Sequence, residues 1–343
     1  MDTILKILEK DYFPDFLIRY QIRKLLQSRI DDEKKSTEEE FMNSFQGFLS
    51  QLKASPVAIH TDAANEQHYE VPTEFYKFVM GKRLKYSSGY WPKKDTNFQE
   101  SEDAMLDLYI ERSQTKDGMR ILDLGCGWGS VSLYFAEKFP KSQITGVSNS
   151  KTQKAYILGE AKKRGLKNLE ILTQDMNTFK ISKTFDRIIS VEMLEHMRNY
   201  QVLFERLSKL LAKDGKFFIH IFTHKEYGYP FEVKDETDWM SKYFFTGGQM
   251  PSDHQFLYFQ DDLKIEKHWR VDGTHYSRTS RAWLENMTAN REKIYPIFEA
   301  TYGKENATKW WVYWRVFFMA CEELWAFNKG REWIVSHYLF SKR

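Results

Sequence analysis

Cysteine, long apolar runs and net charge are all scarce in this sequence of 343 residues. Its two cysteines, Cys126 and Cys321, stand far apart, and no CxxC motif or Cys/His cluster accompanies them. This excludes a disulfide framework and a structural zinc site, and it fits the reducing cytoplasm. No apolar run approaches the roughly 18 residues of a membrane-spanning helix. The first residues lack the apolar core of a secretory signal, so we expect neither secretion nor stable membrane insertion, while transient lipid contact stays open.

The charge balance excludes a further class of partner. A formal net charge of +3 is too small to indicate nucleic-acid binding or a polybasic membrane anchor. The content of 42% apolar and 29% charged residues is typical of a soluble globular protein, and the length suffices for one large or two modest domains. Aromatic residues, at 16%, are unusually frequent.

Strand and helix patterns alternate in the middle of the chain. Apolar strands are expected at residues 120–124, 143–147, 169–172, 185–191 and 215–222, with helices at residues 131–138, 151–164 and 202–211 between them. Such alternation predicts an α/β fold, in which a mostly parallel sheet carries helices on both faces. Ligands of such sheets bind beyond the carboxyl ends of the strands.

The flanking segments have different patterns. Residues 1–60 are typical of amphipathic helices, with one over residues 13–26 and a charged connector at residues 31–40. After about residue 226 the alternation stops, and we expect an insertion at residues 234–273, aromatic helices at 280–302 and 306–327, and a last strand at 333–341. This predicts an N-terminal helical region with a cofactor lid (1–115), a Rossmann-like core (116–225) and a C-terminal substrate cap that completes the sheet (226–343).

A glycine loop follows the first strand in the segment ILDLGCGWGS, residues 121–130. Glycine lets the backbone turn tightly and approach a ligand, and a helix N-terminus follows, so the loop indicates a nucleotide site or, alternatively, a mere tight turn. A dinucleotide fingerprint would need Gly or Ala at Ser130 and an acidic residue about 20 positions on, but the second strand ends in Ser148-Asn149-Ser150. Residues 123–127 resemble instead the first motif of class I S-adenosylmethionine (SAM)-dependent methyltransferases.

Polar residues after the next strands extend this candidate cofactor site. Ser148, Asn149 and Gln153 offer neutral groups for a ribose, with N-capping by Ser150 as the competing explanation. Asp175 either accepts a hydrogen bond from an adenine amine or caps the following turn. Residues 86–91 (YSSGYW) combine hydroxyls with aromatic faces and predict either a lid over the cofactor or an ordinary loop at a strand edge. The complete set of predicted cofactor residues is Tyr86, Ser87, Asp123, Gly125, Gly127, Gly129, Ser148, Asn149, Gln153, Asp175, Met176 and Val191.

The fourth strand leads directly into a charged segment that contains Glu192, Glu195 and His196. If a helix begins near Glu192, then Glu192 and His196 share a face, because they are four residues apart. Two carboxylates and an imidazole at the carboxyl end of a central strand are costly to bury unless they are paired or functional. We therefore predict these three as catalytic; the alternative is a charged helix cap with a satisfied histidine. No third ligand falls at a useful spacing, so we expect no metal.

Beyond these motifs, the chain is similar over nearly its whole length to the plant coclaurine N-methyltransferase family, and more distantly to cyclopropane fatty acid synthases. Several matching segments lie outside a generic cofactor fold. The matches are residues 86–88, 121–129, 191–200 (VEMLEHMRNY), 244–248, 257–262 (LYFQDD), 276–283 and 332–337. The resemblance implies a class I methyltransferase fold, SAM as the cofactor, and a small amine with an apolar or aromatic body as substrate. It places Glu192 and His196 at the substrate amine, with Glu195 beside them.

One departure bears on the reaction. In cyclopropane synthases a bicarbonate base is held by a set that would fall here on Ser88, Glu195, His220, Phe222 and Tyr276. Ser88 replaces a cysteine and Phe222 a smaller aliphatic residue, whereas His220 and Tyr276 agree. The mixture weakens the alternative of methylene transfer to unsaturated lipid acyl chains without removing it. A third hypothesis, a cofactor-binding scaffold without catalysis, is disfavoured because both the glycines and the Glu192/His196 pair are intact.

Aromatic residues gather after the predicted sheet. A pocket of rings suits a planar or lipid-like substrate and attracts a cation through the ring faces. The predicted substrate-binding residues are Ser88, His220, Phe222, Phe245, Tyr258 and Tyr276. For the last helices we expect a core or a subunit interface instead, and their surplus of apolar surface makes a homodimer a hypothesis. The residues concerned are Trp310, Trp311, Trp314, Phe317, Phe318 and Trp325.

Overall fold

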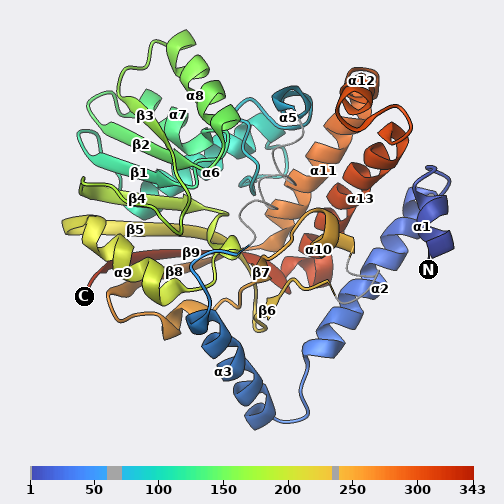
Figure 1. Cartoon of the computed structure of the whole chain (residues 1–343), viewed down its shortest axis with the longest axis horizontal. Coiled ribbons are helices and arrows are strands. Elements are labelled where there is room, and N and C mark those ends of the chain that lie inside the picture. Colours follow the sequence, from blue (N-terminus) through green and yellow to red (C-terminus); the bar gives the residue numbers. More distant parts are fainter. Residues whose placement is uncertain (1, 60–71, 234–238) are drawn as a thin grey trace.

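A computed structural model describes residues 2–59, 72–233 and 239–343, and a mixed sheet runs through its centre (Figure 1). The strands are β1 (Arg120–Leu124), β2 (Gln143–Ser148), β3 (Leu169–Thr173), β4 (Phe185–Val191), β5 (Leu211–His224), β8 (Leu263–Val271) and β9 (Trp333–Lys342). Their order is β3-β2-β1-β4-β5-β9-β8. Strands β1 to β5 are parallel, and β9 runs antiparallel to both of its neighbours. The predicted mostly parallel α/β sheet of the class I methyltransferase fold is confirmed.

Helices cover both faces of this sheet. Successive side chains of a strand point to opposite faces, and because both sets are largely apolar here, both faces must be covered. Leu122 and Leu124 belong to the apolar core formed with α3 (Glu38–Ala54) and α9 (Tyr200–Leu210). Ile121, which precedes Leu122, belongs to the core on the other side, formed with α5 (Thr73–Val79), α6 (Phe98–Ser113) and α7 (Ser130–Lys138). Helix α8 (Lys151–Lys163) packs on β2 and β3.

The remaining helices stand beyond the carboxyl ends of the parallel strands (Figure 1). They are α1 (Asp2–Leu8), α2 (Asp15–Glu33), α10 (Trp239–Tyr243), α11 (Gly273–Ala289), α12 (Arg291–Tyr302) and α13 (Ala307–Ala326), with a short hairpin of β6 (Tyr229–Pro230) and β7 (Gln249–Met250). Arg19 of α2 forms ion pairs of 2.7 Å with Glu322 and 2.8 Å with Glu323 of α13. Helix α2 is therefore fastened alongside α13, although almost the whole chain separates them.

Three expectations about these segments are wrong. The predicted insertion at residues 234–273 contains β8, whose largely polar sequence hid an edge strand of the main sheet. The single helix expected at residues 280–302 is two helices, which begin earlier, at the N-cap Asp272, and meet at Asn290. The charged connector is shorter, since α2 continues to Glu33. Residues 60–71 of the N-terminal region and 234–238 of the insertion lie outside the described residues.

Among the helices that the structure describes, none combines the length and the apolar character needed to cross a bilayer.

Candidate active site

A cavity of about 940 Å³ opens where β1, β2 and β4 end, and it extends between the sheet and helices α2 and α13. One end is lined by the glycine loop and the polar residues after the strands. The other end is lined mainly by apolar side chains, and the two ends meet at Glu192, Glu195 and His196. The wall of the apolar end includes Ile18, Ile22, Leu25, Phe222, Phe245, Met250, Tyr276, Val316, Phe317, Leu324 and Trp325. This position agrees with the general rule for ligands of parallel sheets.

The glycine loop has the backbone that its sequence predicts. Gly125, Gly127 and Gly129 have φ angles of +82°, +51° and +83°, a region that favours glycine. A Cβ on Gly125 would lie 2.5 Å from Cγ of Met193, so the loop packs against the segment that carries the acidic cluster. Gly125 and Gly127 line the cavity. Gly129 is not among the residues that line the cavity, and a Cβ there would meet Ile157 of α8 at 2.7 Å, so this glycine allows the loop to pack closely on α8.

The other predicted cofactor residues lie around the same end of the cavity. Asp123 is buried and accepts a hydrogen bond from Ser132 Oγ at 2.6 Å, and burial raises its pKa to about 6. Ser148 Oγ donates to Gln153 Oε1 at 2.7 Å, and both residues line the cavity with Asn149, Met176 and Val191.

The alternative capping roles expected for Ser150 and Asp175 are present as well. Ser150 Oγ caps α8 by accepting from the Gln153 amide at 3.3 Å. Asp175 accepts from the Asn177 amide at 2.6 Å, which caps the turn, and it lines the cavity too. At these positions capping and cavity lining coexist.

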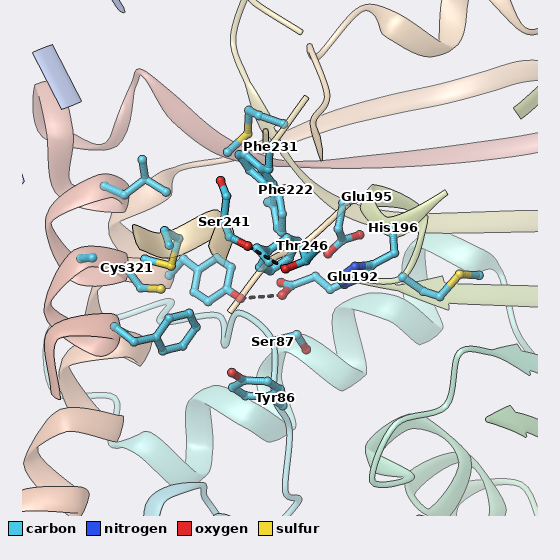
Figure 2. A pocket seen from close by; sticks show the side chains of 18 of the residues that line it. Tyr86, Ser87, Glu192, Glu195, His196, Phe222, Phe231, Ser241, Thr246 and Cys321 are labelled. Carbon is cyan, nitrogen blue, oxygen red and sulfur yellow. Dashed lines mark hydrogen bonds between the residues drawn. The ribbon is translucent and has the colours of Figure 1, made fainter. Parts of the chain in front are cut away.

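The segment predicted as a lid lies next to Glu192. Tyr86 and Ser87 line the cavity wall beside that carboxylate (Figure 2). Behind them the buried Lys85 ammonium donates to Ser87 Oγ and to the Ser88 carbonyl, the latter at 2.8 Å. Burial lowers the pKa of Lys85 to about 8, against the opposing attraction of Glu192 and Glu102. A positive charge therefore stands behind the loop at neutral pH.

Glu192 directly follows strand β4 and has a φ of +46°, an uncommon backbone for a residue other than glycine. The helix expected to begin here is wrong, because a 3₁₀ turn (Leu194–His196) follows instead. Strain of this kind persists where the surroundings fix the residue, and it is frequent at functional sites. Glu192 and His196 still face the same cavity (Figure 2), but through the sharp turn and not through a helical spacing.

Three donors hold the Glu192 carboxylate. Its Oε1 accepts from the Ser88 amide at 3.0 Å and lies 2.9 Å from His220 Nε2, and its Oε2 accepts from the Tyr276 hydroxyl at 2.5 Å. Removal from water raises the pKa of Glu192 to about 7, although Lys85, Tyr276 and Ser88 oppose the shift. The carboxylate is thus poised to gain or lose a proton near neutral pH.

Glu195 and His196 complete the cluster. Burial, followed by the charge of Glu192, raises the pKa of Glu195 well above its usual value. Within the described part of the chain, Glu195 Oε2 has no hydrogen-bond partner. The His196 ring stacks on Phe245 with centroids 4.7 Å apart. The cluster therefore presents acid and imidazole groups to the junction of the polar and apolar ends of the cavity.

The predicted substrate residues divide into three groups. Phe222, Phe245 and Tyr276 line the cavity. Ser88 and His220 reach it through Glu192, as described above. Tyr258 was wrongly predicted, because it is the last residue of a 3₁₀ turn on the far side of the sheet and packs edge-on against Phe45, with centroids 5.5 Å apart.

The aromatic helix α13 gives a further correction. Trp311, Trp314 and Phe318 are buried in the core as expected, but Phe317 and Trp325 line the cavity. Trp325 stacks on Tyr276 with centroids 4.6 Å apart and an interplanar angle of 4°. A signal was present in the sequence, since the cavity-lining positions of α13 recur at helical spacing: Val316, Phe317, Ala320, Cys321, Leu324 and Trp325.

Comparisons with known proteins agree with this geometry. Residues 58–331 match the family described as mycolic acid cyclopropane synthetase. The chain is 42% identical to (S)-coclaurine N-methyltransferase from Thalictrum flavum subsp. glaucum, with 99% of this chain and 95% of the relative covered. It is 30% identical to the cyclopropane-fatty-acyl-phospholipid synthase of Escherichia coli (strain K12), with coverage of 65% of this chain and 56% of the relative. A crystal structure of coclaurine N-methyltransferase bound to N-methylheliamine and SAH superposes with a TM-score of 0.96 at 39% identity, covering 99% of both chains.

Proposed function

Because the chain belongs to the mycolic acid cyclopropane synthetase family, and within it is similar over its full length to N-methyltransferases, we propose that it methylates a small amine with an apolar or aromatic body. Its activity as a SAM-dependent N-methyltransferase, predicted from the sequence, is confirmed by these comparisons. The class of amine and the roles of individual residues are our proposal. The observation that carries it is the position of Glu192, Glu195 and His196 between the glycine loop and the apolar wall.

The polar end of the cavity fits SAM by its shape and by its donor set. The glycine loop leaves room along the backbone at Gly127, where an added Cβ would meet no atom within 4 Å. Around it stand acidic, hydroxyl and amide side chains that suit an amino acid and a ribose: Asp123, Ser148, Asn149, Gln153 and Asp175. When bound, SAM supplies a methyl group on a positively charged sulfur. The Asp123 carboxylate, beside the glycine loop, complements that charge.

Glu192 is suited to accept the proton of the substrate. An alkylamine with a lysine-like pKa of about 10.4 is almost wholly protonated near pH 7.4, and exposing its lone pair costs on the order of 4 kcal/mol. A carboxylate held by three donors and removed from bulk water can hydrogen-bond the ammonium and take its proton, a contribution of about 10²–10⁴-fold. We assign Glu192 this role, with His196 orienting the amine and Glu195 beside it.

The apolar end of the cavity supports an acceptor with a hydrophobic body. Rings from β5, α11 and α13 surround it, and aromatic faces attract a cation by about 0.5–2 kcal/mol. Phe222, Phe245 and Trp325 line this end, and we assign contacts with the substrate to them.

The lipid alternative has less support. It would require Ser88, His220 and Tyr276 to hold bicarbonate, but all three direct hydrogen bonds to Glu192. The hydroxyl of Ser88 donates to the Gly89 carbonyl at 2.9 Å, away from the cavity. Three of the groups that would bind bicarbonate are therefore already used.

The proposal is tested by incubating the protein with labelled SAM and two separate substrate pools, amines and phospholipids. We expect label in the amine pool, and a double variant Glu192→Ala/His196→Ala should lose turnover while its SAM affinity, measured by calorimetry, barely changes. Tyr258→Phe, outside the cavity, is the matched control. Full turnover in the double variant, or bicarbonate-dependent label in the phospholipid pool alone, would overturn the proposal.

Two further expectations stay proposals. A cytoplasmic location is supported by the free thiols of Cys126 and Cys321. The homodimer was proposed from a surplus of apolar surface on the last helices. That argument no longer supports it, because the core aromatic residues of α13 are buried within this chain.

A further inference from the structure

A line of hydrogen bonds runs behind Glu192, away from the cavity, to the half-buried Arg112. We propose that Arg112 and His337 are positioning residues that fix the tautomer of His220, so that an imidazole N–H always faces the Glu192 carboxylate. This proposal rests on the function proposed above, because it explains how the chain keeps Glu192 ready to accept a proton.

The contacts of this line are continuous. Arg112 Nη1, near the end of α6, lies 2.7 Å from Nδ1 of His337 on β9. Nε2 of His337 lies 2.8 Å from Nδ1 of His220, its partner residue on the neighbouring strand β5. Nε2 of His220 lies 2.9 Å from Glu192 Oε1. Both imidazoles are 0% exposed.

The guanidinium sets the direction of every donor in this line. Arginine has N–H donors and no acceptor, so Nδ1 of His337 must carry its lone pair toward Arg112. In a neutral imidazole the proton then sits on Nε2, which donates to Nδ1 of His220. The proton of His220 is consequently on its own Nε2, and it points at Glu192. Burial, the largest cause, lowers the pKa of both histidines well below the usual value, which keeps them neutral.

This fixed direction has a chemical consequence. A proton arriving on Glu192 cannot pass outward along the line, because each imidazole already carries its proton on the side that faces inward. The line therefore acts on the charge of Glu192: hydrogen bonds in series polarise one another, and the cation at the far end strengthens the bond to the carboxylate. The Tyr109 hydroxyl lies 3.0 Å from the same Nδ1 of His220, where it shares the single lone pair with the N–H of His337.

Other ionisable groups also affect the ionisation of Glu192, and they are the same in every variant compared below. Lys85 and Tyr276 favour the carboxylate, while the neighbouring Glu195 opposes it. Cys321 faces the carboxylate from α13. The Arg112 guanidinium lies over the ring of Trp269, 5.1 Å from its centroid, and away from the cavity. Arg112 can therefore be changed without touching a group that lines the substrate site.

The experiment compares Arg112→Met, Arg112→Lys and the wild type by ¹⁵N NMR of labelled histidine and by the pH profile of kcat/KM. Wild type should show His220 and His337 as neutral imidazoles protonated on Nε2. Arg112→Met should lose this single tautomer, and the acid limb of its profile should move up by about half to one pH unit, which lowers kcat/KM roughly 3- to 10-fold below that limb. Above about pH 9 the two profiles should converge. Arg112→Lys, which keeps a cationic donor, should restore most of both signals.

Arg270→Met is the matched control, because Arg270 lies on β8 of the same sheet and bonds Asp253 instead, at 2.7 Å. A wild-type His220 protonated on Nδ1, or an Arg112→Met profile lowered equally at all pH values, would refute the inference. If Arg112→Met does not fold, the wild-type ¹⁵N spectrum still decides. Failure of the proposed function would look different, since the wild type itself would then not methylate amines.

Discussion

Tyr276→Phe is the sharpest test of the role of Glu192, because it removes a single oxygen atom. The Tyr276 hydroxyl donates to Glu192 Oε2 at 2.5 Å. Its ring stacks flat on Trp325, 4.6 Å away, and a phenylalanine ring can keep that contact. The substitution therefore deletes one donor from the carboxylate and leaves the wall of the cavity in place.

The expected size follows from the charge of the acceptor. A hydrogen bond to a charged group contributes about 1.5–3 kcal/mol, and 1.36 kcal/mol corresponds to about one pKa unit. The loss should raise the pKa of Glu192 from about 7 to roughly 8–9. In the role proposed for Glu192, activity requires the carboxylate, so kcat/KM should rise with pH through this pKa, and in the variant it should rise at higher pH. At pH 7 the ionised fraction falls from about one half to roughly 1–10%, a 5- to 50-fold loss of kcat/KM that disappears near pH 10.

The assay is kcat/KM with labelled SAM between about pH 5.5 and 10, with SAM affinity followed by calorimetry in parallel. Tyr258→Phe, on the far side of the sheet, should leave the profile unchanged. A Tyr276→Phe profile that is lowered by the same factor at every pH would mean that the hydroxyl serves structure and not the ionisation of Glu192. The reasoning above would then be refuted.

Two further predictions concern the loop and the cavity wall. Gly129→Ala should destabilise the fold by at least about 1 kcal/mol, because a positive φ is costly for alanine and its Cβ would meet Ile157 at 2.7 Å. Gly159→Ala should instead stabilise the fold by about 0.5–1 kcal/mol, because Gly159 lies in the exposed middle of α8 with open space around it. Thermal unfolding without SAM measures both changes. Ala320→Phe should fill part of the apolar end of the cavity, so KM for amines with bulky bodies should rise while SAM affinity is unchanged. An unaltered KM for large and small amines alike would mean that the substrate binds elsewhere.

The central sheet could be predicted because each buried parallel strand is a short apolar run between turn signals. The expected bounds of β1 and β4 agree with the structure, and those of β2 and β3 differ by one residue. β8 was missed for a physical reason: an edge strand has one exposed side, so LKIEKHWRV carries many charged residues and lacks an apolar run.

The candidate site was predictable in its residues and less so in its geometry. Spacing along the chain suggested a helix at Glu192, whereas a left-handed residue and a 3₁₀ turn bring the acidic groups to the cavity. The support of Glu192 by His220 and Tyr276 spans 28 and 84 positions, and the contacts of His337 with His220 span 117. Periodicity reports only neighbours within one element, so contacts of this kind become visible when the strands are assembled.

The electrostatics of the cavity connect the site with its ligands. Asp123 and Glu192 have pKa values of about 6 and 7 in the folded chain, above the usual values of about 3.9 and 4.3, and burial is the first cause for both. Folding therefore binds protons between about pH 4 and 7, and the free enzyme loses stability as the pH rises through this range. If these carboxylates served stability alone, replacing them with apolar residues would make the folded chain more stable. This energetic cost is understandable if positively charged ligands bind beside these carboxylates, since a sulfonium and an ammonium would each lower the pKa of the carboxylates that they approach. The unfavourable burial of Asp123, Glu192 and Glu195 therefore supports our proposal that a positively charged amine is the acceptor and meets a positively charged methyl donor in this cavity.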